Sequence, residues 1–461
     1  MFDLLEKCLE TSVASQADVI QLRGQERTVT ICSVRNGTVE EFSSITLKGV
    51  GIRVFVDGKS WGFSSTNRLD KESLKGTFTD AVKLARATSA LKKARISLPP
   101  VKASTANVVV PVKKPLKDFS SEDVVRIASD AYKGTKATGP TIASAELTFV
   151  GLEDDKYFLG NEGIRVSEHA TRVLLIAMVM ARSEGTIAPA SENLGHTGGL
   201  ELFDKTPPET FGRTVAEKAM SLLKAKKPPS GRFRVVIHPT LCATLLHEAI
   251  GHPLEADIAM AGGGFDDQIS RLVSSKLITI YDDGCVPGGL GYFPFDDEGV
   301  ECKHTVLLEN GVLKSFMHDR TSAALASATP TGNAHAWDYS AEPLIRQTNI
   351  GIEAGDFALE EMIEDVKEGL FLEGTFGGQA DANGDFTFGF RSARWIHHGE
   401  LGEELRGANV AGNAIEVFKT IDAVGKEATL RPGACGKGQW AIQGRVVPPL
   451  RCEIMVGGVS E

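Results

Sequence analysis

The sequence predicts an α+β protein of two domains, in which an N-terminal domain of mixed helices and strands precedes a β-rich domain with one kinked helix. Three observations lead to this prediction. The chain has 461 residues, more than a single hydrophobic core usually supports. Residues 224–231, rich in lysine and proline, end a helical pattern because proline lacks a donor and disfavours helix before it. Short strands and glycine-rich turns predominate beyond that break, so we place the domains at residues 1–230 and 231–461.

Hydrophobic periodicity predicts the elements of the first domain in order, with helices where apolar residues recur every three or four positions and strands where they alternate. The expected helices cover residues 2–15, 70–91 and 120–132, and a fourth begins at about residue 208. The expected strands cover residues 29–34, 49–56 and 61–63, and two or three more lie within residues 143–181. Asp57-Gly58 is a hairpin turn signal, and residues 98–117 predict an extended crossover.

The second domain is expected to open with a strand over Phe233–Ile237 and a helix over about residues 239–260. A further helix is predicted over about residues 359–368. The remaining sequence is predicted to form short strands and turns, which makes this domain rich in β-structure.

The composition is that of an ordinary globular protein, with 42% hydrophobic and 24% charged residues. The formal net charge of -10 argues against a general nucleic-acid binder, which needs a basic surface to replace phosphate counterions. The longest strongly apolar run, Val173–Ala181, is far short of the roughly 20 residues of a membrane helix. The seven cysteines are widely spaced and form no CxxC pair, which favours reduced thiols. We therefore expect a cytoplasmic protein that binds neither nucleic acid nor membrane.

A His-Glu pair and a second histidine close the apolar helix that starts the second domain, in the order His247-Glu248-Ala249-Ile250-Gly251-His252. Five positions on a regular helix turn the second histidine about 140° from the first, so one ion cannot bind both. Gly251 and Pro253 are residues that end or kink helices, and a π-bulge would also bring the two histidines to one face. We therefore predict a helix broken or bulged at Gly251.

A metal ion is the simplest partner for these polar groups, because a buried His-Glu pair without a partner would be costly. Glu248 is then placed to take a proton from an attacking water. A chance pair of histidines is the competing interpretation of the hexapeptide alone. Glu255 and Asp257 are available to orient an imidazole from behind, although Asp257 is more typical of a solvated helix face.

The spacing does not determine the third ligand. Cys435 is the best candidate among the cysteines, because the glycine-rich segment 433–438 lets backbone amides approach its sulfur. Lys437 would favour its thiolate form. Glu255 is the rival ligand.

Residues 247–257 resemble the HExxxH signature of the TldD/PmbA family of zinc peptidases, on the TldD (catalytic) side. Further segments match the family in order, and the resemblance spans nearly the whole chain. The matching segments are Gly51-Ile52-Arg53, Trp61-Gly62-Phe63, residues 295–299, 311–314 and 318–320, Thr331-Gly332-Asn333, Arg346 with Thr348-Asn349, Gly377-Gly378-Gln379, Gly412-Asn413 and Gly457-Gly458.

The resemblance implies that His247, His252 and Cys435 bind Zn²⁺ and that Glu248 is the catalytic base. It also implies an enclosed cavity in which unfolded or small peptides are cleaved, and a homodimer or a heterodimer with a related subunit that lacks the metal motif. The sequence departs from the family pattern at residues 334–337 and 391–395, which bear on substrate preference and on the partner.

The hypothesis from the sequence is thus metal-assisted amide hydrolysis, with an extended peptide pairing with a free strand edge of the second domain. His318, Arg320 and Tyr339 are candidates for holding the oxyanion. The alternative is a non-catalytic, metal-stabilised scaffold or regulatory subunit of a peptidase complex. That alternative needs no glutamate beside the first ligand and favours a closed site of four ligands.

Overall fold

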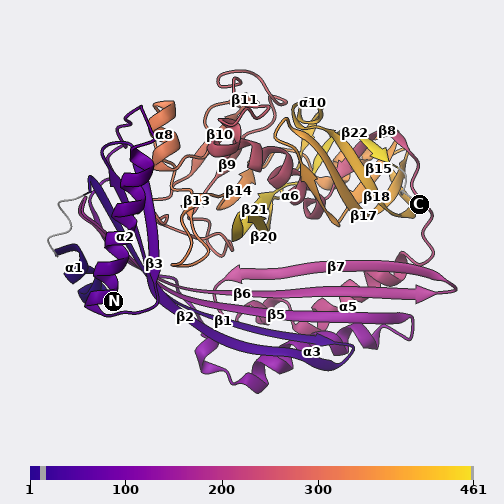
Figure 1. The fold of residues 1–461 in the computed structure, drawn as a ribbon. Helices are drawn as coiled ribbons and strands as arrows, with labels where there is room; N and C mark the ends of the chain where they lie inside the picture. The colour runs from indigo at the N-terminus through magenta and orange to yellow at the C-terminus, as the bar shows by residue number, and fades with distance from the viewer. Residues whose placement is uncertain (11–16, 458–461) are drawn as a thin grey trace.

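The computed structural model describes residues 1–10 and 17–457 (Figure 1). It confirms the predicted α+β class. The first half is one seven-stranded sheet in the order β3-β2-β1-β5-β6-β4, with β7 paired to β6. Its strands are β1 (Val19–Arg35), β2 (Thr38–Val56), β3 (Ser60–Thr66), β4 (Ser104–Val109), β5 (Ile142–Gly160), β6 (Ile164–Ser183) and β7 (Thr186–Thr197).

Helices cover this long sheet at two separate places and enclose two cores. Helix α2 packs on β2 and β3, and helices α3 and α5 pack together on β5 and β6 (Figure 1). The helices of this half are α1 (Phe2–Glu10), α2 (Lys71–Ser89), η2 (Leu116–Asp118), α3 (Ser121–Ala137), α4 (Leu202–Lys205) and α5 (Pro208–Ser221). The predicted helix over residues 2–15 is confirmed as far as Glu10, and residues 11–15 lie outside the described residues.

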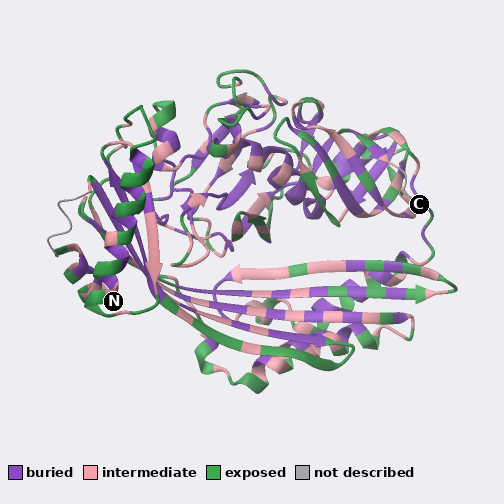
Figure 2. Ribbon diagram, in the orientation of Figure 1, coloured by how far each residue is buried: buried purple, intermediate pink, exposed green. Residues whose placement is uncertain are grey.

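Strands β1 and β2 are much longer than the sequence predicts. The first part of β2 is largely exposed (Figure 2), so it lacks the alternating pattern that marks a half-buried strand. Pairing with β1 along its whole length holds it in the sheet. Asn36 and Gly37, with φ values of 51° and 87°, make the tight turn between the two strands, as Asp57-Gly58 does between β2 and β3.

The second half contains two sheets that pack around helix α6. One has the order β15-β8-β22-β18-β17-β16, with β19 on β22, and the other has the order β11-β10-β9-β14-β21-β20. Their strands are β8 (Gly231–Ile237), β9 (Ile280–Asp282), β10 (Thr305–Glu309), β11 (Val312–Leu313), β14 (Asn349–Ile352), β15 (Glu368–Glu373), β16 (Gly377–Ala380), β17 (Asp385–His397), β18 (Glu400–Asn413), β19 (Ala423–Val424), β20 (Thr429–Lys437), β21 (Gln439–Val447) and β22 (Leu450–Gly457). A small ribbon pairs β12 (Ala334–His335) with β13 (Leu344–Ile345).

The helices of this half are short, and one interrupted series carries the predicted histidines. They are α6 (Pro239–Leu246), η3 (His247–Gly251), η4 (His252–Leu254), α7 (Ala256–Ala259), α8 (Arg320–Ala326), α9 (Leu359–Glu364) and α10 (Ala414–Lys419). Every residue of α6 is buried, because the helix lies in the core formed with both sheets.

The β20–β21 hairpin lies at the edge of the second half that faces the long sheet, where β20 contacts β7 (Figure 1). Strand β8 starts at Gly231, directly after the predicted linker, and the division of the chain at about residue 230 stays a prediction. In the part of the chain that the structure describes, no helix combines the length and apolarity needed to cross a membrane.

Candidate metal centre

The helix that carries the motif changes its winding at the first histidine. Helix α6 is regular up to Leu246, and residues 247–251 form a π-turn closed by a bond from the His252 amide to the His247 carbonyl. A 3₁₀ turn with Pro253 follows. The wider π-turn places residues five apart on the same face, so the predicted deformation at Gly251 is confirmed.

Gly251 leaves room for a side chain that supports the first histidine. A Cβ atom at this position would lie 2.3 Å from Oε1 of Gln347, a separation that real carbon atoms do not adopt. Gln347 uses this space to bind His247 twice, through Oε1 to Nδ1 at 2.7 Å and through Nε2 to the carbonyl at 3.2 Å. Glycine is therefore needed here for space.

The structure brings His247, His252 and Cys435 together, with one ligand atom of each within 4.8 Å of the others. The sulfur of Cys435 lies 3.1 Å from Nε2 of His252. The two imidazole rings are tilted, with centroids 4.5 Å apart. Cys435 reaches this place from β20, 183 residues beyond His252, and it is a free thiol.

Hydrogen bonds behind the two rings point both Nε2 atoms inward. Gln347 engages Nδ1 of His247, and Glu255 engages Nδ1 of His252 at 3.1 Å. Such outer contacts fix the ring orientation and the tautomer of a metal-binding histidine. Glu255 therefore lies behind His252. The sequence suggests two roles for Glu255, orienting an imidazole or binding the metal, and this position corresponds to the first.

Lys437 has a different role from the one expected. Its ammonium group lies 2.6 Å from Glu255 and 2.8 Å from Asp257, so it neutralises the two carboxylates behind His252. Burial raises the pKa of the Cys435 thiol, but the hydrogen bond from His252 and the charges of His252 and Arg346 lower it by more. The thiolate is thus favoured by His252 and Arg346.

The donor set fits a zinc ion. Burial lowers the pKa of His252, yet the hydrogen bonds to Cys435 and Glu255 outweigh it and raise the pKa to about 10. Burial, together with the charges of Arg445 and His252, holds the pKa of His247 well below its ordinary value, so that ring is neutral. His252 and Cys435 share a proton across their hydrogen bond. A borderline-soft cation such as zinc binds two imidazoles and a thiolate, and it would displace this proton.

Glu248 lies beside both histidines but is not one of the three clustered ligand residues. Its carboxylate oxygens are 3.8 Å from Nε2 of His247 and 4.0 Å from Nε2 of His252, and 22% of its side chain is exposed. Burial raises the pKa of Glu248, while the charges of His252 and Arg445 oppose that rise. A partly exposed carboxylate here can accept a proton from a water molecule that enters the site.

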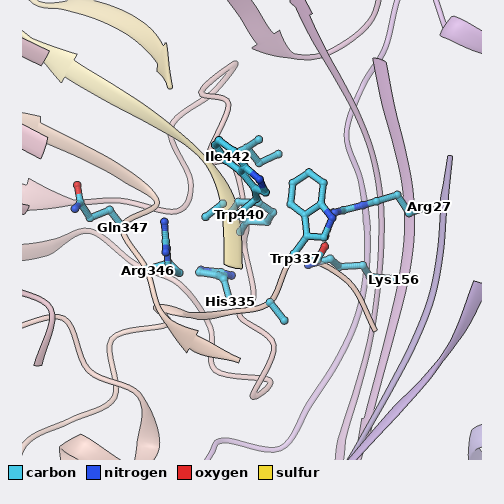
Figure 3. Close-up of a pocket in the computed structure, with 11 residues that line it drawn as sticks. Arg27, Lys156, His335, Trp337, Arg346, Gln347, Trp440 and Ile442 are labelled. Carbon is cyan, nitrogen blue, oxygen red and sulfur yellow. The ribbon is translucent and has the colours of Figure 1, made fainter. Parts of the chain in front are cut away.

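Arg346 fastens the β20–β21 hairpin to the site, a role that sequence reasoning missed. Its guanidinium is buried and donates to the carbonyl of Cys435 at 3.0 Å and to that of Lys437 at 3.1 Å. Gln443 on β21 donates to Nε2 of His247 at 3.2 Å. Figure 3 shows Arg346 and Gln347 on one side of the hairpin, with Arg27 reaching toward Trp337 from the long sheet.

The three oxyanion candidates are engaged elsewhere. His318 binds Ser322 at 3.1 Å, and the guanidinium of Arg320 pairs with Glu162 at 2.6 Å. The ring of Tyr339 lies against Gly49 on β2. The charge of Arg445, like that of Arg346, acts on both Glu248 and Cys435, and no sequence signal singled Arg445 out.

Known proteins match the chain along nearly its full length. Three family models match in order: PmbA/TldA metallopeptidase domain 1 over residues 20–85, its central domain over 114–223 and its C-terminal domain over 230–458. A metalloprotease of Methanocaldococcus jannaschii is 34% identical over 94% of each chain. A zinc metalloprotease TldD homologue of Saccharolobus solfataricus is 27% identical over 96% of each chain. The crystal structure of TldE from Thermococcus kodakarensis covers 99% of this chain and 100% of its own, with a TM-score of 0.81 and 19% identity.

Proposed function

The chain belongs to the PmbA/TldD metallopeptidase family, and from that premise we propose that it is a zinc-dependent peptidase that hydrolyses unfolded or small peptides. The convergence of His247, His252 and Cys435 is the observation that carries this proposal. Zinc is the metal named for one relative, and it is a common partner of two imidazoles and a thiolate.

His247 and His252 would hold the ion through Nε2, and Cys435 through its sulfur. A zinc ion in this place would act as a Lewis acid and make water nucleophilic near neutral pH. Gln347 and Glu255 keep the two rings in position from behind. Three protein ligands leave one position of a tetrahedral site for water or substrate, as in catalytic rather than structural sites.

Glu248 is the general base in this proposal. Its carboxylate stands beside both histidines and is partly open to solvent, so it can take a proton from the attacking water and give it to the leaving amine. A metal-stabilised scaffold or regulatory subunit would have no use for a carboxylate in this position. The geometry therefore favours the peptidase over that alternative.

A peptide would lie along β20. This strand is at the edge of its sheet and carries Cys435, so an extended substrate paired with it would pass beside the metal ligands. Main-chain pairing gives affinity with little sequence preference, which suits a peptidase of unfolded chains. We further propose that the protein acts in the cytoplasm as a dimer, with a second copy or with a related subunit of the same fold.

The substitution Glu248→Gln tests the catalytic role. We expect bound zinc, measured by atomic absorption, to remain at the wild-type level while hydrolysis of a flexible peptide falls at least a hundredfold. Glu217→Gln, at an exposed position of α5, is the control and should leave both quantities unchanged. Hydrolysis that survives Glu248→Gln would remove the assigned base. Hydrolysis that a chelator leaves intact would remove the metal from the reaction.

A further inference from the structure

A polar cavity of about 260 Å³ opens between the long sheet and the second half, lined in part by α6 and by the β20–β21 hairpin that carries Cys435. We call it the arginine pocket after three of its lining residues, Arg391, Arg431 and Arg445. Glu192 is the one acidic residue in its wall. Ser191, Thr244 and Phe376 also line it.

The pocket and the proposed base share one helix face. Thr244 on α6 lines the pocket, and Glu248 follows four residues later, which is one helical turn. Arg445 lines the pocket as well, and its charge acts on both Glu248 and Cys435. A group bound in the pocket is thus about one turn of helix from the base.

Positive charge in this cavity is only partly compensated. Arg431 and Arg445 are directly opposite each other on the β20–β21 hairpin, a cross-strand pair of like charges that repel. Arg431 is paired with Glu192, whereas the side chain of Arg445 makes no ion pair or hydrogen bond with any residue in the described part of the chain, and its Nε is buried. Burial of Arg445 lowers its pKa to about 10, against the charge of Glu248.

Arg391 is held in the pocket by neutral partners. Its guanidinium donates to the hydroxyl of Ser191 and lies 4.5 Å from the ring centre of Phe376. Burial lowers its pKa to about 10 as well, and the charge of Glu192 does not restore it. Three guanidinium groups and one carboxylate line the cavity, and Glu248 acts on Arg445 from outside the wall without pairing with it. This leaves a local excess of positive charge that a bound anion would balance.

We propose that the arginine pocket binds a carboxylate group of the peptide substrate, so that acidic or carboxyl-terminal segments are preferred for cleavage. The proposal rests on the peptidase function above and names its substrate class. Planar guanidinium groups match a carboxylate with two parallel hydrogen bonds, which selects it over a neutral amide of the same shape. The carboxylate belongs either to an Asp or Glu side chain or to the free C-terminus.

Binding is measured in the Glu248→Gln protein, which keeps the pocket and does not consume the peptide. Four fluorescent peptides of otherwise identical sequence are compared. Each has either Glu or Gln at one position, and either a free or an amidated C-terminus. Fluorescence anisotropy gives their dissociation constants at low salt. We expect the best acidic peptide to bind roughly tenfold or more tightly than its neutral match, as for one charged hydrogen-bonding group. The peptide pair that carries this difference identifies the source of the carboxylate.

Substitutions in the pocket should remove that preference. Arg391→Gln and Arg431→Gln should bring acidic and neutral peptides to similar dissociation constants, and Arg391→Glu should favour a peptide with Lys at the varied position. Arg394→Gln is the control, because Arg394 lies on the same strand β17, is exposed and donates to the carbonyls of Leu401 and Gly402. It should keep the preference, and thermal unfolding confirms that each variant is folded.

The outcomes separate the two proposals. Equal affinity of the wild-type pocket for acidic and neutral peptides would overturn the carboxylate proposal, even if the active protein cleaves both. A preference that Arg391→Gln and Arg431→Gln both retain would overturn it too. Charge-dependent binding without cleavage by the zinc-loaded wild-type protein would instead leave the pocket assignment standing and refute the peptidase function.

Discussion

At Gly251 a single methyl group would collide with the side chain that orients His247, one of the proposed metal ligands. In Gly251→Ala the new Cβ would meet Gln347 at 2.3 Å, so Gln347 must move and release Nδ1 of His247. Loss of such an orienting contact typically weakens metal binding 10–100-fold. We expect a loss of this size, measured by competition with a zinc chelator.

Gly76→Ala provides the matched control, because Gly76 lies inside helix α2 and an added Cβ there meets no atom within 4 Å. It should leave zinc affinity unchanged and raise the free energy of unfolding by roughly 0.5–1 kcal/mol. Equal zinc affinity in Gly251→Ala and the wild type would show that Gln347 does not position His247.

The sequence indicates His247, Glu248 and His252 at the residue scale because a local spacing carries their chemistry. It also indicates Gly251, because a regular helix would turn the next histidine away from the first, and a glycine at this point allows the helix to deform. Gln347 and Arg445 could not be found in this way. Gln347 contacts His247 and the charge of Arg445 acts on Glu248, in each case about a hundred or more positions away, and only the folded chain brings these residues together.

At the scale of elements, the β20–β21 hairpin carries Cys435, one of the proposed ligands, and Arg346 holds the hairpin in place. Lysine at position 346 would keep the charge near Cys435 but cannot reach the carbonyls of both Cys435 and Lys437. We expect Arg346→Lys to lower the free energy of unfolding by about 1–3 kcal/mol in urea titrations. Zinc affinity should fall with it, because Cys435 is less firmly placed.

Arg394→Lys is the comparison for that experiment, since Arg394 also donates to two carbonyls of a hairpin but at the surface. Its effect on unfolding should stay within about 0.5 kcal/mol. Similar losses in both variants would show that the Arg346 contacts are no more important than ordinary surface contacts.

Elements with a strong local signal follow the sequence closely. The apolar run before His247 gives helix α6, and Gly251 with Pro253 gives the π-turn and the 3₁₀ turn. The exposed part of β2 shows the opposite case, because pairing with β1 extends it where its own residues carry no pattern. The Asn36-Gly37 turn could have revealed the length of this hairpin, since such a pair between strands is a strong turn signal.

At the scale of the whole molecule, buried and partly buried ion pairs join the long sheet to the second half. Arg53 pairs with Glu298, Arg320 pairs with Glu162, and Lys156 lies 3.3 Å from Asp297. These pairs cross the predicted division of the chain, and their partners are separated by more than a hundred positions. No local pattern could therefore predict them, although the family resemblance marks residues 295–299 as important.

Asp297 makes the junction sensitive to acid. Burial would raise the pKa of its carboxyl group, but the charges of Lys156, Arg23 and His335 and the Ala336 amide lower the pKa well below the ordinary value. A folded-state pKa below that of the unfolded chain stabilises the fold above about pH 4, and this contribution is lost as the pH falls below that value. The wild-type protein should therefore lose stability steeply on acidification through this range.

Asp297→Asn tests this account, because the amide keeps the shape and removes the charge. Leaving Lys156 and Arg23 without their buried partner should lower the free energy of unfolding at pH 7 by about 3–5 kcal/mol. The difference in unfolding free energy between the variant and the wild type should shrink toward pH 3, because the wild-type carboxyl group is then losing its own stabilising contribution. Asp266→Asn, at an exposed position, should leave the pH profile unchanged. Urea titrations at several pH values measure both variants, and a loss for Asp297→Asn that is constant with pH would mean that charge at this junction does not hold the two halves together.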